Sequence, residues 1–212
     1  MVNNFIYEVD NKSYQVIIIH KRIRNIHYRF DGEKFLVSAP RLVSLKQIKS
    51  GLDKFAQKLI KRSVQAQAET DEFIYLLGEK KELVYPGSIE MNDGAIISYK
   101  DEKQMHTKLR KWFLLYLEKR VRIYEEKMGA PHYEVKVRTM KSRYGSNNRS
   151  SESLTFSMVL VHYSEEIIDS VIVHELAHCF VYDHSAKFYK VVYKYCPNYD
   201  MLRKKLIKAE FN

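Results

Sequence analysis

The sequence predicts an α+β fold, with a strand-rich N-terminal subdomain followed by a small core that carries the chemistry. Hairpin signals recur within the first hundred residues, whereas apolar residues at helical spacing cover 45–67 and 104–128. A third apolar helical run, 167–181, contains the pattern His-Glu-x-x-His. With 212 residues, 45% of them hydrophobic, the chain is long enough for one globular domain or two small subdomains.

The first hundred residues alternate between strands and turns. Asp31-Gly32 and Asn92-Asp93-Gly94 are strong turn signals between apolar segments. Ser44 is placed to cap the one helix of this part, 45–67. The predicted strands are 5–9, 13–19, 28–30, 34–39, 73–77, 81–85, 89–91 and 95–99.

The charged segment 100–103 predicts a boundary between subdomains at 1–100 and 101–212. A long helix follows it and ends at Gly129, with Pro131 just beyond. The segment 141–150 is polar, basic and rich in turn residues. The remaining predicted elements are strands at 134–139 and 154–161 and helices at 186–195 and 199–209.

The candidate chemical centre is the segment from His174 to His184. Because an α-helix repeats every ~3.6 residues, His174 and His178 share one face, while Glu175 lies about 100° further round. Two neutral imidazoles at this spacing suit zinc, and a turn after residue 181 would bring His184 back as a third ligand. Three protein ligands leave one position for water, which is typical of a catalytic site. Zinc lowers the pKa of that water, and Glu175 is the candidate general base.

The motif also resembles a known family. The pattern His-Glu-Leu-Ala-His-x5-His, followed by Ser185, Phe188 and 197–199 (Pro-Asn-Tyr), is similar to the YgjP-like metallopeptidases, which are relatives of the SprT-like proteases among the zincins. The segment 141–146 is similar to the family's Arg-Trp-Gly-Ser segment, and the likeness runs from about residue 13 to 207. The family usually has Trp in place of Tyr144 and Cys in place of Asn147.

This resemblance implies a zinc metallopeptidase, a hydrolase that cuts polypeptides, with a zincin-type core. It implies one Zn²⁺ per chain, bound by His174, His178 and His184, and a catalytic base at Glu175. In zincins a strand like 154–161 borders the cleft and pairs with the extended substrate backbone.

Several further residues are candidates for stabilising the oxyanion of a tetrahedral intermediate. Arg143 and Tyr144 are the first candidates, although their segment also reads as a turn that only supports the fold. Weaker candidates for the same role are His162, Tyr163 and Tyr182.

Composition limits the remaining possibilities. Two cysteines, no basic segment followed by an apolar run at the N-terminus and no apolar run of ~20 residues predict a cytoplasmic protein without a membrane partner. A net charge of +10 permits nucleic-acid association without requiring it. Two alternatives stay open: a non-catalytic, basic nucleic-acid-binding protein braced by zinc, and a metal-dependent hydrolase acting on something other than peptides.

Overall fold

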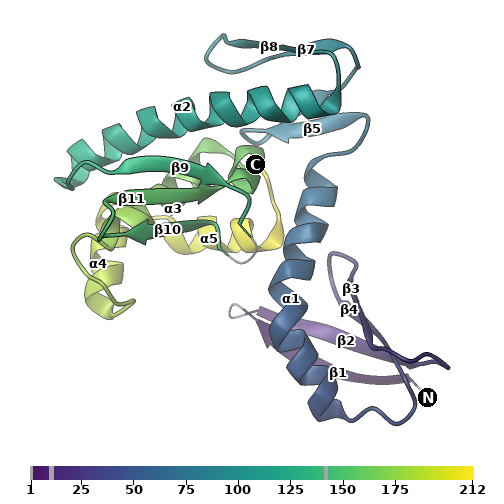
Figure 1. The fold of residues 1–212 in the computed structure, drawn as a ribbon. Helices are drawn as coiled ribbons and strands as arrows, with labels where there is room; N and C mark the ends of the chain where they lie inside the picture. The colour runs from purple at the N-terminus through teal and green to yellow at the C-terminus, as the bar shows by residue number, and fades with distance from the viewer. Residues whose placement is uncertain (1, 10–11, 141–142) are drawn as a thin grey trace. The chain divides into compact units, whose positions relative to one another are not determined.

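The computed structural model describes residues 2–9, 12–140 and 143–212, and it divides the chain into two compact units, 1–67 and 68–212. Helices and strands are mixed throughout, so the predicted α+β class is confirmed (Figure 1). The division falls earlier than the boundary predicted at residue 100. The reason is that residues 68–100 form hydrogen bonds with the C-terminal part: the N–H of Leu77 donates to Val161 O (2.8 Å), and that of Gly78 donates to His162 O (3.2 Å).

The N-terminal unit is a four-stranded sheet with one helix. Its strands are β1 (Val2–Val9), β2 (Lys12–His20), β3 (His27–Phe30) and β4 (Phe35–Ala39), in the order β1-β2-β4-β3. Only β2 and β4 are parallel; the other pairs are antiparallel. Alternate strand residues such as Val16, Phe35 and Val37 are buried, as are Ile48 and Leu52 of helix α1 (Leu45–Ala68). Alternate residues of the strands and residues at helical spacing in α1 thus form one core, with the sheet as one layer and the helix as the other.

The C-terminal unit begins with two hairpins and a long helix. The hairpins pair β5 (Phe73–Leu76) with β6 (Glu79–Glu82), and β7 (Gly87–Glu90) with β8 (Ile96–Tyr99). Helix α2 (Glu102–Met128) starts where the Asp101 carboxylate accepts the N–H of Gln104 (2.8 Å). It ends at Gly129, whose φ of 67° is left-handed and therefore favours glycine.

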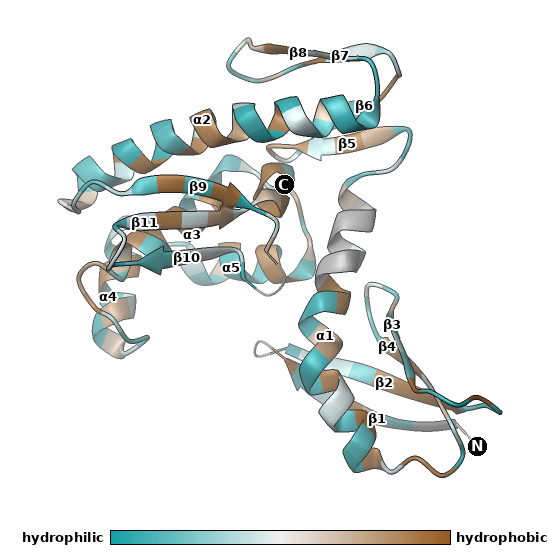
Figure 2. Cartoon of the chain, viewed as in Figure 1, coloured by the Kyte–Doolittle hydropathy of each residue, from teal (hydrophilic) through white to brown (hydrophobic). Residues whose placement is uncertain are grey.

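A three-stranded sheet lies next to this helix, with the order β10-β11-β9. Its strands are β9 (Glu134–Arg138), β10 (Gly145–Asn148) and β11 (Ser153–Ser157). Strand β11 is shorter than the predicted 154–161, because residues 158–162 form a 3₁₀ helix, η1 (Met158–His162). Strand β10 was not predicted, and Figure 2 shows why: it is hydrophilic beside the hydrophobic β11.

Helix α3 (Glu165–Ala177) is buried on nearly all sides and contacts α2, α4 (Ala186–Tyr195), α5 (Tyr199–Lys208) and β10. Its polar attachments to α2 are few and specific. Asp169 accepts hydrogen bonds from Arg120 Nε (3.0 Å) and the Tyr124 hydroxyl (2.9 Å). The Tyr116 hydroxyl donates to Glu165 (3.0 Å). These contacts fix the helix that carries the His-Glu pair.

Two smaller findings bear on the predicted setting of the protein. Within the described residues, no helix is both long enough and apolar enough to cross a membrane. Cys179 and Cys196 are both free thiols. The cytoplasmic location stays a prediction.

Candidate metal centre

Helix α3 supplies the first two functional side chains at its C-terminal end. His174 and Glu175 lie in its last turn, and His178 is the residue that caps it, with helical φ and ψ of −63° and −15°. The helix therefore ends four residues before the predicted limit at 181. Tighter turns follow it, with Cys179 N–H donating to Leu176 O (2.9 Å) and Phe180 N–H donating to Ala177 O (3.0 Å). After these turns, His184 returns to the end of the helix.

The three histidines converge. The Nε2 atoms of His174 and His184 are 3.2 Å apart, and one ring nitrogen from each of the three histidines lies within 4.8 Å of the others. Two nitrogens bound to one tetrahedral zinc at ~2.0–2.1 Å are separated by about 3.3–3.4 Å. The spacing and the all-imidazole donor set therefore fit a zinc ion bound through Nε2.

The imidazoles are held by packing and by hydrogen bonds to their other nitrogens. The buried ring of Phe188 lies against all three, with ring centroids 4.9, 4.6 and 4.9 Å from those of His174, His178 and His184. His178 Nδ1 is 3.1 Å from Tyr182 O, so it carries a proton that it donates to the carbonyl. His174 Nδ1 is 2.7 Å from the Tyr199 hydroxyl. Both contacts leave Nε2 free for a metal.

Electrostatics also favours neutral imidazoles here. The pKa of His174 is lowered to about 3, first by burial and then by the neighbouring His178 and His184. Burial likewise lowers the pKa of His178, with a further contribution from His184. Because a metal binds only the unprotonated ring, these shifts keep the site available near neutral pH.

Glu175 is the buried carboxylate of the site, with only 6% of its surface exposed. Burial raises its pKa to about 8, while the charge of Arg143 and the backbone N–H of Asn147 act in the opposite direction. The residue beside it has to be glycine: a Cβ on Gly145 would lie 2.5 Å from Glu175 Oε1. A carboxyl group with a pKa of about 8 can take up and release protons near neutral pH.

Strand β10 and the residue after it, Arg149, form hydrogen bonds with the end of α3. The Asn147 side-chain amide donates to the backbone carbonyl of Glu175 (2.8 Å), and Arg149 donates to that of Cys179 (2.8 Å). Both carbonyls belong to the last helical turn and the residues after it, where no intrahelical partner exists. Sequence reasoning missed these hydrogen bonds, and the polar segment 141–150 was their only signal.

The other predicted residues occupy varied positions. Arg143 is exposed and close enough to influence the pKa of Glu175. The Tyr144 hydroxyl donates to Leu206 O (3.3 Å) in α5, and that of buried Tyr163 donates to the same carbonyl (3.1 Å). Both hydroxyls therefore support packing.

The two remaining weaker candidates also have other environments. His162 is buried, with Nδ1 2.8 Å from Tyr75 O. Tyr182 is 79% exposed.

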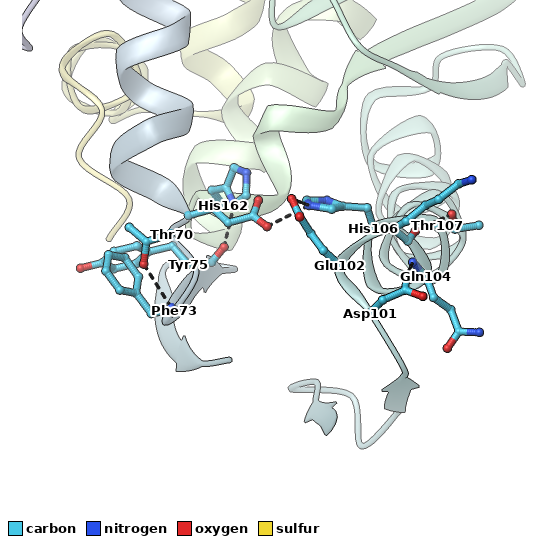
Figure 3. A network of polar contacts seen from close by, with 11 residues as sticks. Thr70, Phe73, Tyr75, Asp101, Glu102, Gln104, His106, Thr107 and His162 are labelled. Atoms are coloured by element: carbon cyan, nitrogen blue, oxygen red, sulfur yellow. Dashed lines mark hydrogen bonds and ion pairs between the residues drawn. The ribbon is translucent and has the colours of Figure 1, made fainter. Parts of the chain in front are cut away.

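A second group of potential ligands lies near the start of α2. His106 Nε2 lies 2.9 Å from Glu69 Oε1 and 3.7 Å from Glu102 Oε1. These are the distances of ion pairs between the imidazole and the two carboxylates. Figure 3 shows His106 beside Glu102, while the nearby His162 bonds to Tyr75. Hydrogen bonding to Glu69 raises the pKa of His106, which opposes metal binding. Of the two groups, the histidine triad is therefore the better candidate for a metal site.

Comparison with known proteins places the chain in a family. A family model described as "YgjP-like, metallopeptidase domain" matches residues 24–209. Two solved structures are similar over 42% of this chain, the metallopeptidase zymogens abylysin of Pyrococcus abyssi and jannalysin of Methanocaldococcus jannaschii. Abylysin is 20% identical, with 90% of its chain covered and a TM-score of 0.41. Jannalysin is 21% identical, with 92% of its chain covered and a TM-score of 0.39. No curated protein matches.

Proposed function

Because the chain belongs to the YgjP-like metallopeptidase domain family, we propose that it is a zinc-dependent peptidase with its ion held by His174, His178 and His184. The observation that carries this proposal is the convergence of three imidazoles at the end of a helix whose last turn also holds the buried carboxylate of Glu175. Three protein ligands leave a coordination position open, as catalytic zinc sites require.

In this proposal, Glu175 transfers the proton, and Tyr199 and Tyr182 hold the histidines in place. A zinc ion in this site supplies Lewis acidity, which polarises the scissile carbonyl and lowers the pKa of water. Glu175 removes a proton from the attacking water and passes it to the leaving amine, so that one carboxyl group serves first as base and then as acid. The Tyr182 carbonyl can only accept, so it keeps His178 in the tautomer that presents Nε2, and the Tyr199 hydroxyl accepts the Nδ1 proton of His174 when Nε2 of that ring binds the metal.

The substrate backbone is proposed to lie along β10. Strand β11 is the middle strand of its sheet and is paired on both sides, so it has no free edge to offer. Strand β10 is an edge strand, contacts α3 and places Gly145 against Glu175. An extended peptide added to this edge would pass the catalytic carboxylate. Arg143, beside Glu175, is then the better placed of the two proposed oxyanion stabilisers, since the Tyr144 hydroxyl already bonds to Leu206.

The direct test is Glu175→Gln, assayed on a fluorescently labelled unfolded protein such as casein. We expect the rate to fall by about 10²–10⁴-fold, the usual contribution of a general base, while zinc content stays unchanged. Glu166→Gln is the matched control, because Glu166 is an exposed carboxylate in the first turn of the same helix. A Glu175→Gln protein that cuts at the wild-type rate would remove this residue from the mechanism.

Wild-type protein that holds zinc and yet cleaves no polypeptide would contradict the peptidase proposal itself. In that case a panel of non-peptide substrates would separate another metal-dependent hydrolase from a protein in which zinc only braces the fold.

A further inference from the structure

The positive charge of the chain is concentrated in the N-terminal unit. Residues 1–67 contain 13 Lys and Arg against 5 Asp and Glu, a net charge of +8, whereas residues 68–212 contain 23 against 21, a net charge of +2. Less than a third of the chain thus carries most of the total of +10. The unit that holds the histidine triad is nearly neutral.

The topology of this unit gathers cations at one edge of its sheet. Because β2 and β4 are parallel, their carboxyl ends meet at the same edge, where His20 pairs with Ala39 and the Lys21 N–H donates to Ala39 O (2.9 Å). The loops after these two strands, and the start of α1, therefore lie together (Figure 1). They carry five exposed cations, here called the cationic edge: Lys21, Arg22, Arg24, Arg41 and Lys46.

The opposite edge carries acidic residues. The ends of β1 and β3 and the starts of β2 and β4 lie there, with the exposed residues Glu8, Asp31 and Glu33. Asp31 Oδ2 lies 4.0 Å from Lys34 Nζ, so the ion pair of Asp31 is with a residue of its own hairpin. Among the residues that the structure describes, no carboxylate forms an ion pair with any member of the cationic edge. Its charge is therefore uncompensated.

Two features make this edge suited to phosphate. Three of its five members are arginines, whose planar guanidinium groups match phosphate oxygens in bidentate fashion. Helix α1 also begins here, capped by reciprocal bonds between Ser44 and Gln47 (3.0 and 3.3 Å), and the positive end of its dipole adds to the same field.

The pattern favours a nucleic acid over a membrane surface. Leu42 (98% exposed) and Leu45 (53% exposed) are the large apolar side chains exposed within this edge, and two leucines do not make the continuous apolar face of a helix that inserts into lipid. The aromatic side chains of Tyr14 and Phe35 in the sheet are buried, so bases cannot stack on these two rings. Contacts to the backbone alone predict binding that depends little on sequence.

We propose that the cationic edge of the N-terminal unit binds the phosphate backbone of nucleic acid. This inference does not depend on the proposed peptidase activity, which resides in the other unit. It assigns the basic charge of the chain to a defined surface.

The test compares the full-length wild-type chain with the triple variant Arg22→Gln, Arg24→Gln, Arg41→Gln. Binding to a fluorescein-labelled 30-base-pair duplex and to a 30-nucleotide single strand is followed by fluorescence anisotropy at several salt concentrations. We expect the triple variant to bind about ten-fold or more weakly, and the slope of log K against log salt to decrease by about 3, one for each lost phosphate contact.

A matched control removes the same charge elsewhere: Lys103→Gln, Lys111→Gln, Lys119→Gln, all exposed positions on α2. This control is expected to keep the wild-type affinity and slope, and both triple variants are expected to keep the wild-type rate of peptide hydrolysis. Equal losses in the two triple variants would mean a diffuse charge effect and would overturn the proposal. So would wild-type protein that binds vesicles containing phosphatidylserine through these arginines, with no affinity for either nucleic acid.

Discussion

The hydroxyl of Tyr199 is predicted to set the zinc affinity of the triad. It lies 2.7 Å from His174 Nδ1, and its ring stacks on the imidazole with centroids 5.8 Å apart. Tyr199→Phe removes the hydrogen bond and keeps the stacking ring, so the fold should be preserved. Loss of such an outer partner typically costs 10–100-fold in metal affinity, or about 1.4–2.8 kcal/mol.

The assay is a titration of apo-protein with zinc in competition with a chromogenic chelator. Tyr193→Phe is the matched control: its hydroxyl also makes a hydrogen bond, to Asp200 at 3.0 Å, but contacts no ligand histidine. The control should bind zinc as the wild type does. A Tyr199→Phe affinity within two-fold of wild type would refute the argument that this hydroxyl orients His174.

Three further predictions follow from the C-terminal unit. Gly145→Ala, whose Cβ would lie 2.5 Å from the Glu175 carboxylate, should lower kcat/KM by about 100-fold with zinc content unchanged; normal activity would show that the carboxylate can move aside. Arg120→Met, which leaves partly buried Asp169 without its cation, should cost about 2–4 kcal/mol in urea unfolding, and a loss below about 1 kcal/mol would contradict this. Glu69 raises the pKa of His106, so this contact stabilises the fold fully below the unfolded pKa of about 6.5, and the stabilisation is lost as pH rises through the folded value. The advantage of wild type over His106→Gln in urea should therefore shrink as the pH rises above about 6.5, and a constant difference would exclude this linkage.

Local signals predicted the helices well because caps and turns are decided by neighbouring residues. The predicted helix 186–195 agrees with α4, and the helix ending at Gly129 agrees with α2. Strand β10 escaped prediction, because Gly-Ser-Asn-Asn has low strand propensity and pairs only through its partner β11.

The limits of the sequence are clearest where distant segments meet. The charged run at 100–103 suggested a domain boundary, yet Leu77 bonds to Val161 and ties the hairpins to the C-terminal unit. Similarly, helical periodicity alone places His174 and His178 on one face, whereas the approach of the Tyr199 hydroxyl depends on the packing of α5 against α3. The cationic edge depends on the parallel pairing of β2 and β4, which no local pattern encodes.

Zinc stoichiometry tests the central claim most directly. Protein purified without chelators or metal-affinity tags would be analysed by inductively coupled plasma mass spectrometry, as wild type, as His184→Ala and as His27→Ala, an exposed histidine of the N-terminal unit. We predict about one zinc per chain in the wild type and the His27→Ala control, and loss of zinc in His184→Ala. Wild-type protein that contains no zinc and takes up none when it is added would contradict the account, because the three histidines would then not form a metal site.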